Sequence, residues 1–164
     1  KAERSQPGGS DLFRRLKPRG RNDAAAMGAD LAKHNLVPDL AAVSTAARTR
    51  ETWALAGAAF TPAVPVAFES RIYDAEADDI LAVIAETDAK IETLAVVGHN
   101  PGVHELAALL AGSGDANAQD RLALGFPTAG VAVIAFDSRD WHLRPHSGRI
   151  ERFISPKTVS GATD

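Results

Sequence analysis

The sequence contains no cysteine among its 164 residues. Disulfides, thiolate nucleophiles and cysteine-ligated metal sites are therefore excluded, and the absence fits a reducing compartment. A signal peptide is also missing, and so is any apolar run long enough to span a bilayer. Together these absences predict a cytoplasmic protein that does not act on a membrane.

The sequence also has no large excess of either positive or negative charge. The 18 Lys and Arg residues face 21 Asp and Glu residues, which gives a formal net charge of −3. A surface for nucleic acid needs concentrated positive charge, so we expect no nucleic-acid partner. Any site for an anion has to be a local concentration of Arg and His side chains.

Length and apolar content indicate one domain spanning residues 1–164, because 164 residues of which 45% are hydrophobic can bury one sizeable core. Helical patterns and short apolar runs alternate along the chain. The predicted helices are 21–34, 45–60, 75–87 and 100–112, and the predicted strands are 38–44, 64–70 and 91–98. This alternation predicts a parallel sheet with helices on its faces.

The pattern changes after Gly112. Residues 113–128 indicate a loop or a short helix, and the apolar runs 129–137 and 141–155 then follow each other without a helix between them. The intervening SRD predicts a hairpin, and hence one antiparallel pair, whereas residues 156–164 read as a frayed tail. We therefore expect a three-layer α/β/α sandwich around a mostly parallel, mixed sheet.

A predicted strand ends on a histidine in the segment AVVGHNPG, residues 95–102. Asn100 as N-cap and Pro101 at the first helical position predict that a helix follows directly. Ligands of open α/β sheets bind at the carboxyl ends of the strands, where helix amides attract anions. His99 is therefore a candidate anion-binding residue. The alternative is a histidine that only caps the strand end through backbone hydrogen bonds.

The segment STAARTRET, residues 44–52, follows another strand. We expect Arg48 one turn into the next helix, where its guanidinium group suits two phosphate oxygens at once. The alternative is a surface arginine paired with Glu51. Because His99 and Arg48 follow two strands of one sheet, together they favour a phosphate site at its edge.

These motifs, taken in order, resemble those of the histidine phosphatase superfamily, the phosphoglycerate-mutase-like group, and within it the SixA-type phosphohistidine phosphatases. The resemblance covers nearly the whole chain and implies the phosphoglycerate-mutase-like fold. The similar segments are LKPRGRNDAAAMGADL (16–31), VSTAARTRETW (43–53), VVGHNPG (96–102) and FPTAGVAVIAF (126–136).

The family's signature, an N-terminal strand that ends in arginine, histidine and a small residue, has no match in the chain. That histidine is the nucleophile that becomes phosphorylated. The opening KAERSQ is similar to the residues that follow the signature, so we expect about ten preceding residues to carry it in the intact protein. None of the other histidines has a strand-end setting; they are His34, His104, His142 and His146.

For the intact protein, the resemblance implies a phosphatase that needs neither a metal nor a cofactor. Its substrate would be a phosphorylated protein, with phosphohistidine the favoured group, or a small phosphorylated molecule. The missing histidine attacks phosphorus, His99 and Arg48 stabilise the phosphoryl oxygens, and water hydrolyses the covalent phosphohistidine intermediate. Asn100 is expected to bind phosphate beside Arg48.

The segment RIYD, residues 71–74, is similar to the family's pattern around a proton donor, with Asp in place of Glu. Asp74 is therefore the candidate acid or base, and the alternative is an N-cap for the helix predicted from Ala75. Arg14, in the polar opening segment, is either a further phosphate ligand or a solvated charge.

Two other functions remain open. A metal site would use the histidine pairs His99 with His104 and His142 with His146, but the first spacing is poor for one helical face. The other alternative is a noncatalytic module of the same fold that binds phosphate or a phosphoprotein without turning it over.

Overall fold

Two three-stranded sheets form the centre of the computed structural model, which describes residues 1–5 and 7–161. In the first sheet, β2 (Val66–Glu69) and β3 (Leu94–Val97) pair in parallel with the central strand β1 (Leu40–Ser44). In the second, β6 (Gly148–Ile154) pairs in parallel with β4 (Ala111–Gly114) and antiparallel with β5 (Val131–Ala135). The mostly parallel, mixed pairing is thus confirmed, although the strands form two sheets where one was predicted.

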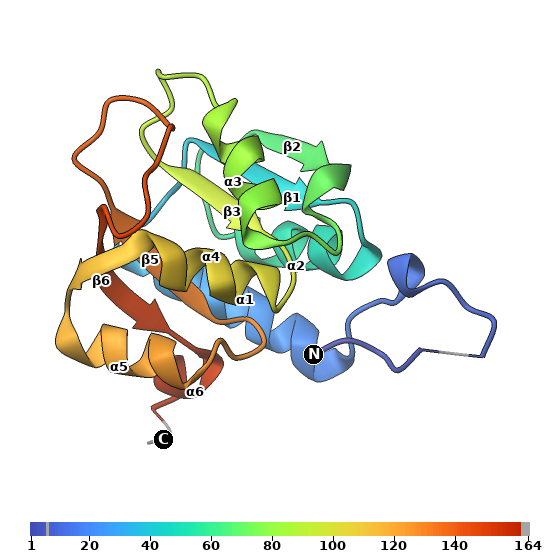
Figure 1. Cartoon of the computed structure of the whole chain (residues 1–164). Coiled ribbons are helices and arrows are strands. Elements are labelled where there is room, and N and C mark those ends of the chain that lie inside the picture. Colours follow the sequence, from blue (N-terminus) through green and yellow to red (C-terminus); the bar gives the residue numbers. More distant parts are fainter. Residues whose placement is uncertain (6, 162–164) are drawn as a thin grey trace.

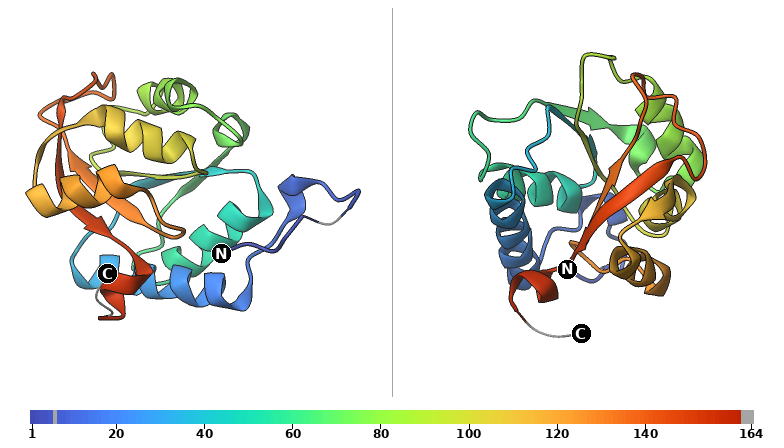
Figure 2. Two further views of the ribbon diagram at one scale, coloured as in Figure 1. Left: turned by 60° about the horizontal axis from the view of Figure 1, so that its bottom comes forward. Right: turned by 90° about the vertical axis from the view of Figure 1, so that its left-hand side faces the viewer.

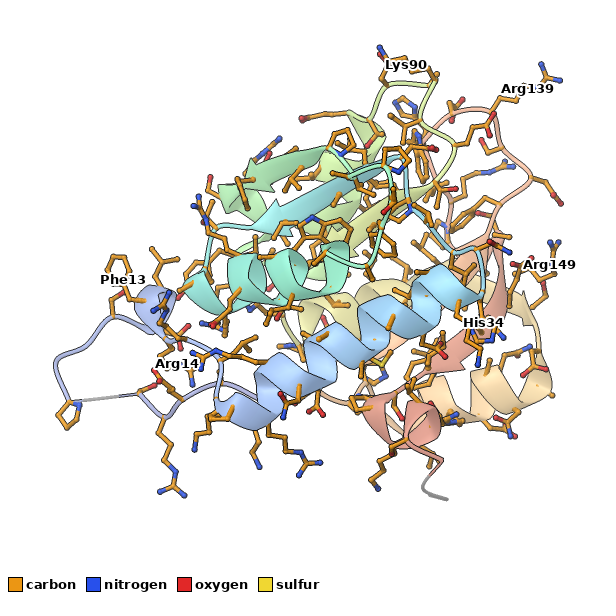
Figure 3. All side chains as sticks on the ribbon, turned by 180° about the vertical axis from the view of Figure 1, so that it is seen from behind. Phe13, Arg14, His34, Lys90, Arg139 and Arg149 are labelled. Atoms are coloured by element: carbon orange, nitrogen blue, oxygen red, sulfur yellow. The ribbon has the colours of Figure 1, made fainter. Side chains whose placement is uncertain are left out.

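Helices cover both faces of these sheets, which confirms the three-layer arrangement (Figures 1 and 2). One layer contains α1 (Pro18–Lys33) and α2 (Ala47–Gly57), which lie in front when the molecule is viewed from behind (Figure 3). The other contains α3 (Ala77–Ala85), α4 (Gly102–Leu110) and α5 (Ala116–Leu124). Shorter helices are η1 (Asp11–Phe13), η2 (Ser70–Ile72) and α6 (Pro156–Val159).

The side chains of β1 point alternately to the two faces of the sheet, so they contribute to two separate parts of the core. Ala41 and Val43 are fully buried against Trp53 and Phe60 in the layer of α1 and α2. Ala42 points to the opposite face and packs with Ile80, as expected for a strand whose successive side chains face opposite ways. Because both faces of β1 are covered, its carboxyl end is held rigidly between the helix layers.

The region after α4 differs from the prediction. The predicted helix 100–112 ends at Leu110, and the next residues form β4 beside β6. Glycine permits this approach, since Gly114 has a φ of 124° and a side chain there would overlap the Ile150 backbone. Packing against β6 therefore overrides the helical pattern.

The predicted antiparallel pair is confirmed, but the tight turn predicted at SRD is wrong. β5 and β6 do pair antiparallel, but residues 136–147 join them as a long loop. The apolar residues that resembled a strand are packed instead against the core around α3 and α4, where Trp141 also donates a hydrogen bond to the Ile91 carbonyl (2.9 Å). Of the tail predicted as frayed, residues 156–159 form α6 and residues 162–164 lie outside the described residues.

Candidate functional site

A pocket of about 350 Å³ lies at the carboxyl ends of the three parallel strands of the first sheet. It contains all four side chains predicted for the site. The lining residues are Asp11, Arg14, Arg48, Tyr73, Asp74, His99 and Asn100. The fold therefore brings together segments that are far apart in the sequence.

His99 follows β3 and is held by a neighbour on each side. Its Nε2 lies 2.7 Å from the Ser44 hydroxyl at the end of β1, and its Nδ1 lies 3.2 Å from an Arg48 nitrogen. A guanidinium group can only donate, so Nδ1 accepts this hydrogen bond and the ring proton sits on Nε2. His99 therefore donates to Ser44, which is fully buried and fixes the plane of the imidazole.

Burial and the nearby charge of Arg48 lower the pKa of His99 from 6.5 to about 4. The negative charges of Asp11 and Asp74 oppose this shift without cancelling it. His99 is therefore neutral near pH 7 in this environment. An entering dianion favours the protonated ring, so binding of phosphate would raise this pKa again.

Arg48 lies in the first turn of α2, as predicted, and its guanidinium group faces the pocket. It donates to the backbone carbonyl of Asp11 and to the Asp11 carboxylate, both at 2.9 Å. The alternative pairing with Glu51 is wrong, because Glu51 instead accepts from Arg21 at 2.6 Å and from the Leu16 amide. The guanidinium group of Arg48 thus donates to Asp11, an acceptor inside the site.

Asp11 and Tyr73 were not predicted as site residues. The Asp11 carboxylate accepts from Arg48, from the Tyr73 hydroxyl (2.9 Å) and from Arg14. Burial alone would raise the pKa of Asp11, but these hydrogen bonds and charges lower it overall. An ionised carboxylate is consequently paired with the guanidinium group of Arg48.

Arg14 belongs to the pocket rather than to solvent, since it lines the cavity and donates to Asp11 and to the Glu3 carbonyl. The only sequence signal for each of these two residues was that it lies close to a candidate residue. Asp11 lies three positions before Arg14, and Tyr73 precedes Asp74 in RIYD. Neither signal states which residue reaches the site. The Tyr73 ring stands edge-on to His99, with centroids 5.5 Å apart.

Asp74 lines the pocket but does not cap α3. Its φ of 51° places it in a turn, and the N-cap is Glu76, which forms a capping box with Asp79. The alternative structural role predicted for Asp74 is therefore wrong. Its exposed carboxyl contributes negative charge beside His99.

Asn100 also lines the pocket, but it is not the N-cap of α4, because that position is Pro101. The Asn100 amide donates to the Phe126 carbonyl at 2.7 Å. The Val103 amide of the first helical turn donates to the His99 carbonyl, so this turn is tied to His99. Phosphate binding by Asn100 stays a prediction.

The remaining histidines lie elsewhere. His34 caps the end of α1, and His104 bonds to the Leu122 carbonyl at 2.8 Å. His142 and His146 lie in the loop between β5 and β6. Within residues 1–5 and 7–161, no three His, Asp or Glu side chains form a group that could hold a metal ion.

A second hollow, of about 340 Å³, lies around the end of α1, β6 and α6, and it contains none of the predicted site residues. In the part of the chain that the structure describes, no helix has the length and apolar character needed to cross a membrane.

Two mycobacterial proteins are similar to this chain in sequence. No family model matches the chain. An uncharacterized protein of Mycobacterium leprae is 33% identical over 149 residues, which cover 90% of this chain and 90% of that protein. An uncharacterized protein of Mycobacterium tuberculosis is 35% identical over 159 residues, which cover 95% of this chain and 98% of its own length.

Three solved structures are similar to this chain in fold. A candidate phosphohistidine phosphatase SixA from Agrobacterium tumefaciens has a TM-score of 0.78 and 29% identity, over 95% of this chain and 93% of its own. Its counterpart from Nakamurella multipartitia has a TM-score of 0.80 and 27% identity, over 94% and 90%. Protein histidine phosphatase SixA complexed with tungstate, at 19% identity and a TM-score of 0.77 over 97% and 94%, shows the shared fold.

The layered fold that this chain shares with these solved structures is phosphoglycerate-mutase-like. The chain belongs to the SixA-type histidine phosphatases.

Proposed function

We propose that the intact protein is a metal-independent phosphatase that acts on protein phosphohistidine through a covalent phosphohistidine intermediate. The observation that carries this proposal is the row Ser44–His99–Arg48, which fixes one imidazole and one guanidinium group at the same end of the sheet. Both groups suit the oxygens of a phosphoryl group in transfer. The SixA proteins of similar fold support the same reaction class.

The nucleophile is proposed to be a histidine that precedes Lys1. Among the described residues, His99 is the only histidine that lines the pocket. The described part of the chain also leaves one edge unpaired on β3 and one on β5, and the apolar side chains of both strands are only half-buried. These open edges support the placement of a further strand that carries the nucleophile.

In the proposed reaction, this histidine attacks phosphorus opposite the leaving group, so the new N–P bond forms as the old bond breaks. Arg48 and His99 neutralise the charge on the equatorial oxygens. Arg48 exchanges its Asp11 partner for phosphate, and His99 takes up a proton on Nδ1 to become a second donor. Water then attacks phosphorus, which releases inorganic phosphate and restores the nucleophile.

Asp74 is the proposed proton donor to the leaving group. Its carboxyl lines the pocket and is exposed, so the leaving group of a bound substrate can reach it. Asp11 is less suited, since its carboxylate already accepts hydrogen bonds from Arg48, Arg14 and Tyr73. Asn100 completes the proposed phosphate site from the start of α4.

Turnover by variants of the intact protein tests the site. His99→Ala or Arg48→Ala removes one preorganised group, which should raise the barrier by ~2.7–4 kcal/mol and lower kcat by about 10²–10³-fold. Arg50→Ala is the matched control, because Arg50 lies two residues along α2, is exposed and stacks on Phe68. Wild-type rates in both site variants would exclude this assignment.

The codons that precede Lys1 test the nucleophile. We expect them to encode an apolar strand ending in arginine, histidine and a small residue. An upstream segment without histidine would refute the covalent mechanism. It would favour the alternative of a noncatalytic module that binds phosphate.

A further inference from the structure

The N-terminal arm, which we define as residues 1–5 and 7–17, projects from the body of the molecule (Figures 1 and 2). Two of its residues, Asp11 and Arg14, line the pocket. Its two ends run antiparallel through a bridge between Ala2 and Leu16. At the base, Leu16 is buried and its amide donates to Glu51 of α2. Further out, Asp11 of η1 bonds to Arg48. The arm is therefore held at two points and keeps one orientation relative to the pocket.

Charge is divided unevenly between the arm and the body. Residues 1–17 contain five Lys and Arg against two Asp and Glu, whereas the rest of the chain contains thirteen against nineteen. Arg4 and Arg15 are exposed, and neither forms an ion pair within the described residues. The near balance of the whole sequence thus conceals a basic arm on an acidic body.

An apolar side chain stands on the same arm. Phe13 is 73% exposed and points away from the molecule on η1, the short helix whose Asp11 contacts Arg48 (Figure 3). Phe13, Arg4 and Arg15 are not among the residues that line the pocket. A ligand that fills only the pocket therefore does not use them.

We propose that the arm is a docking surface for an acidic region of a phosphorylated protein, with Phe13 as the apolar anchor and Arg4 and Arg15 as the charged contacts. This inference rests on the proposed function, because it supplies the substrate of the same site. Positive charge beside the pocket attracts an acidic partner and repels a basic one. An exposed aromatic ring that meets an apolar residue supplies the kind of contact that dominates protein interfaces.

Two synthetic phosphohistidine peptides test the proposal on the intact protein. Both carry one leucine near the phosphohistidine, which in one peptide is flanked by four glutamates and in the other by four lysines. The acidic peptide should have a kcat/KM about ten-fold higher, since several weak charge pairs add together, and the difference should shrink in high salt. Equal values for the two peptides would refute the docking surface.

Variants of the arm separate docking from chemistry. Arg4→Ala/Arg15→Ala should remove most of the preference, and Phe13→Ala should raise KM about five-fold for the acidic peptide without changing kcat. Free phosphohistidine, which fills only the pocket, should respond to none of these changes. A matching loss with free phosphohistidine would show that the arm acts on the pocket itself and would overturn the proposal.

Matched controls are available on the far side of the molecule. Arg139→Ala/Arg144→Ala removes two exposed arginines from the loop between β5 and β6, and Arg139 lies opposite Phe13 in Figure 3. Val37→Ala shortens an exposed apolar residue that precedes β1, at the other end of the sheet. Both controls should retain the preference for the acidic peptide.

Binding keeps this proposal distinct from the catalytic one. If neither peptide is hydrolysed, the proposed reaction fails, and fluorescence anisotropy of the labelled, unphosphorylated acidic peptide still measures docking. Binding that is weakened by Arg4→Ala/Arg15→Ala supports the arm. Binding that is insensitive to these substitutions overturns it.

Discussion

At the scale of single residues, His99 combines two properties that are in tension. Its hydrogen bonds to Ser44 and Arg48 fix a neutral ring, whereas its place beside Arg48 suits the binding of an anion. Burial and the positive charge of Arg48 keep its pKa low until a ligand arrives. In the proposed reaction, His99 would therefore couple uptake of a proton to binding of phosphate.

The lowered pKa of His99 predicts a specific dependence of stability on pH. Between pH 6.5 and about 4 the unfolded chain binds a proton that the folded chain does not, so the free energy of unfolding falls as the pH falls through this window. The full contribution of His99 to the free energy of unfolding is present above pH 6.5. The shift of this pKa sets an upper limit of roughly 3–4 kcal/mol on that contribution.

Urea unfolding of the wild type and His99→Gln at a series of pH values isolates this contribution, because all the other titratable groups are present in both proteins. The wild type should lose more stability than the variant between pH 6.5 and 4. Parallel curves for the two proteins would contradict the assigned ionisation of His99.

Asp11 is expected to weaken the binding of phosphate, in contrast to Arg48 and His99. Its carboxylate holds Arg48 and competes with an entering anion, so Asp11→Asn should bind inorganic phosphate more tightly. We expect the dissociation constant to fall about five-fold, equivalent to ~1 kcal/mol for a partly exposed ion pair. Isothermal titration calorimetry measures this change.

Asp23→Asn is the control for that measurement, since Asp23 pairs with Arg19 on α1 and does not line the pocket. Its dissociation constant should match that of the wild type. Weaker phosphate binding by Asp11→Asn would show instead that Asp11 mainly positions Arg48.

At the scale of elements, the sequence predicted those parts of the site that depend on local pattern. His99 and Arg48 follow strands whose apolar runs are clear, and the carboxyl ends of parallel strands meet at one edge. Asp11 has no such pattern, because its contact with Arg48 spans 37 positions and depends on how the arm folds back. The spacing of apolar residues in the sequence does not indicate the direction in which the arm folds back.

The second sheet was harder to predict for a related reason. The apolar run that includes Trp141 and Leu143 looks like a strand, yet these side chains pack on the α3 and α4 core from a loop. Likewise Ala111 continues a helical pattern but pairs with Gly148 of β6. Contacts between distant segments decided both outcomes, and sequence periodicity does not record such contacts.

Gly102 links the helices that flank the site. A Cβ at this position would overlap the Ala75 carbonyl oxygen, so α4 approaches the start of α3 only because the side chain is absent. Gly102→Ala should therefore lower the free energy of unfolding by about 1–3 kcal/mol, as overpacking does elsewhere. Because α4 begins three residues after His99, phosphate binding should weaken as well.

Chemical denaturation checks the loss of stability, and Glu105→Ala is its control on the exposed face of the same helix. The control should stay within about 0.5 kcal/mol of the wild type. If Gly102→Ala is equally mild, the close packing of α3 and α4 is not what positions the start of α4.

At the scale of the whole molecule, the two sheets share their helix layers. Val96 of β3 and Ile134 of β5 pack on one apolar cluster, although the described strands leave an edge of each unpaired. The site lies at the end of one of these strands. A strand placed between the two edges would both complete the sheet and deliver a nucleophile beside His99.

The central claim is that phosphate is transferred to a histidine that is not His99. Rapid-quench labelling of the intact protein with a ³²P-phosphohistidine peptide, after exhaustive chelation of metal ions, tests it directly. A phosphoenzyme should form that is labile in acid and stable in base, and peptide mapping should place the label before Lys1. Label on His99, or labelling that requires a restored divalent ion, would contradict the account.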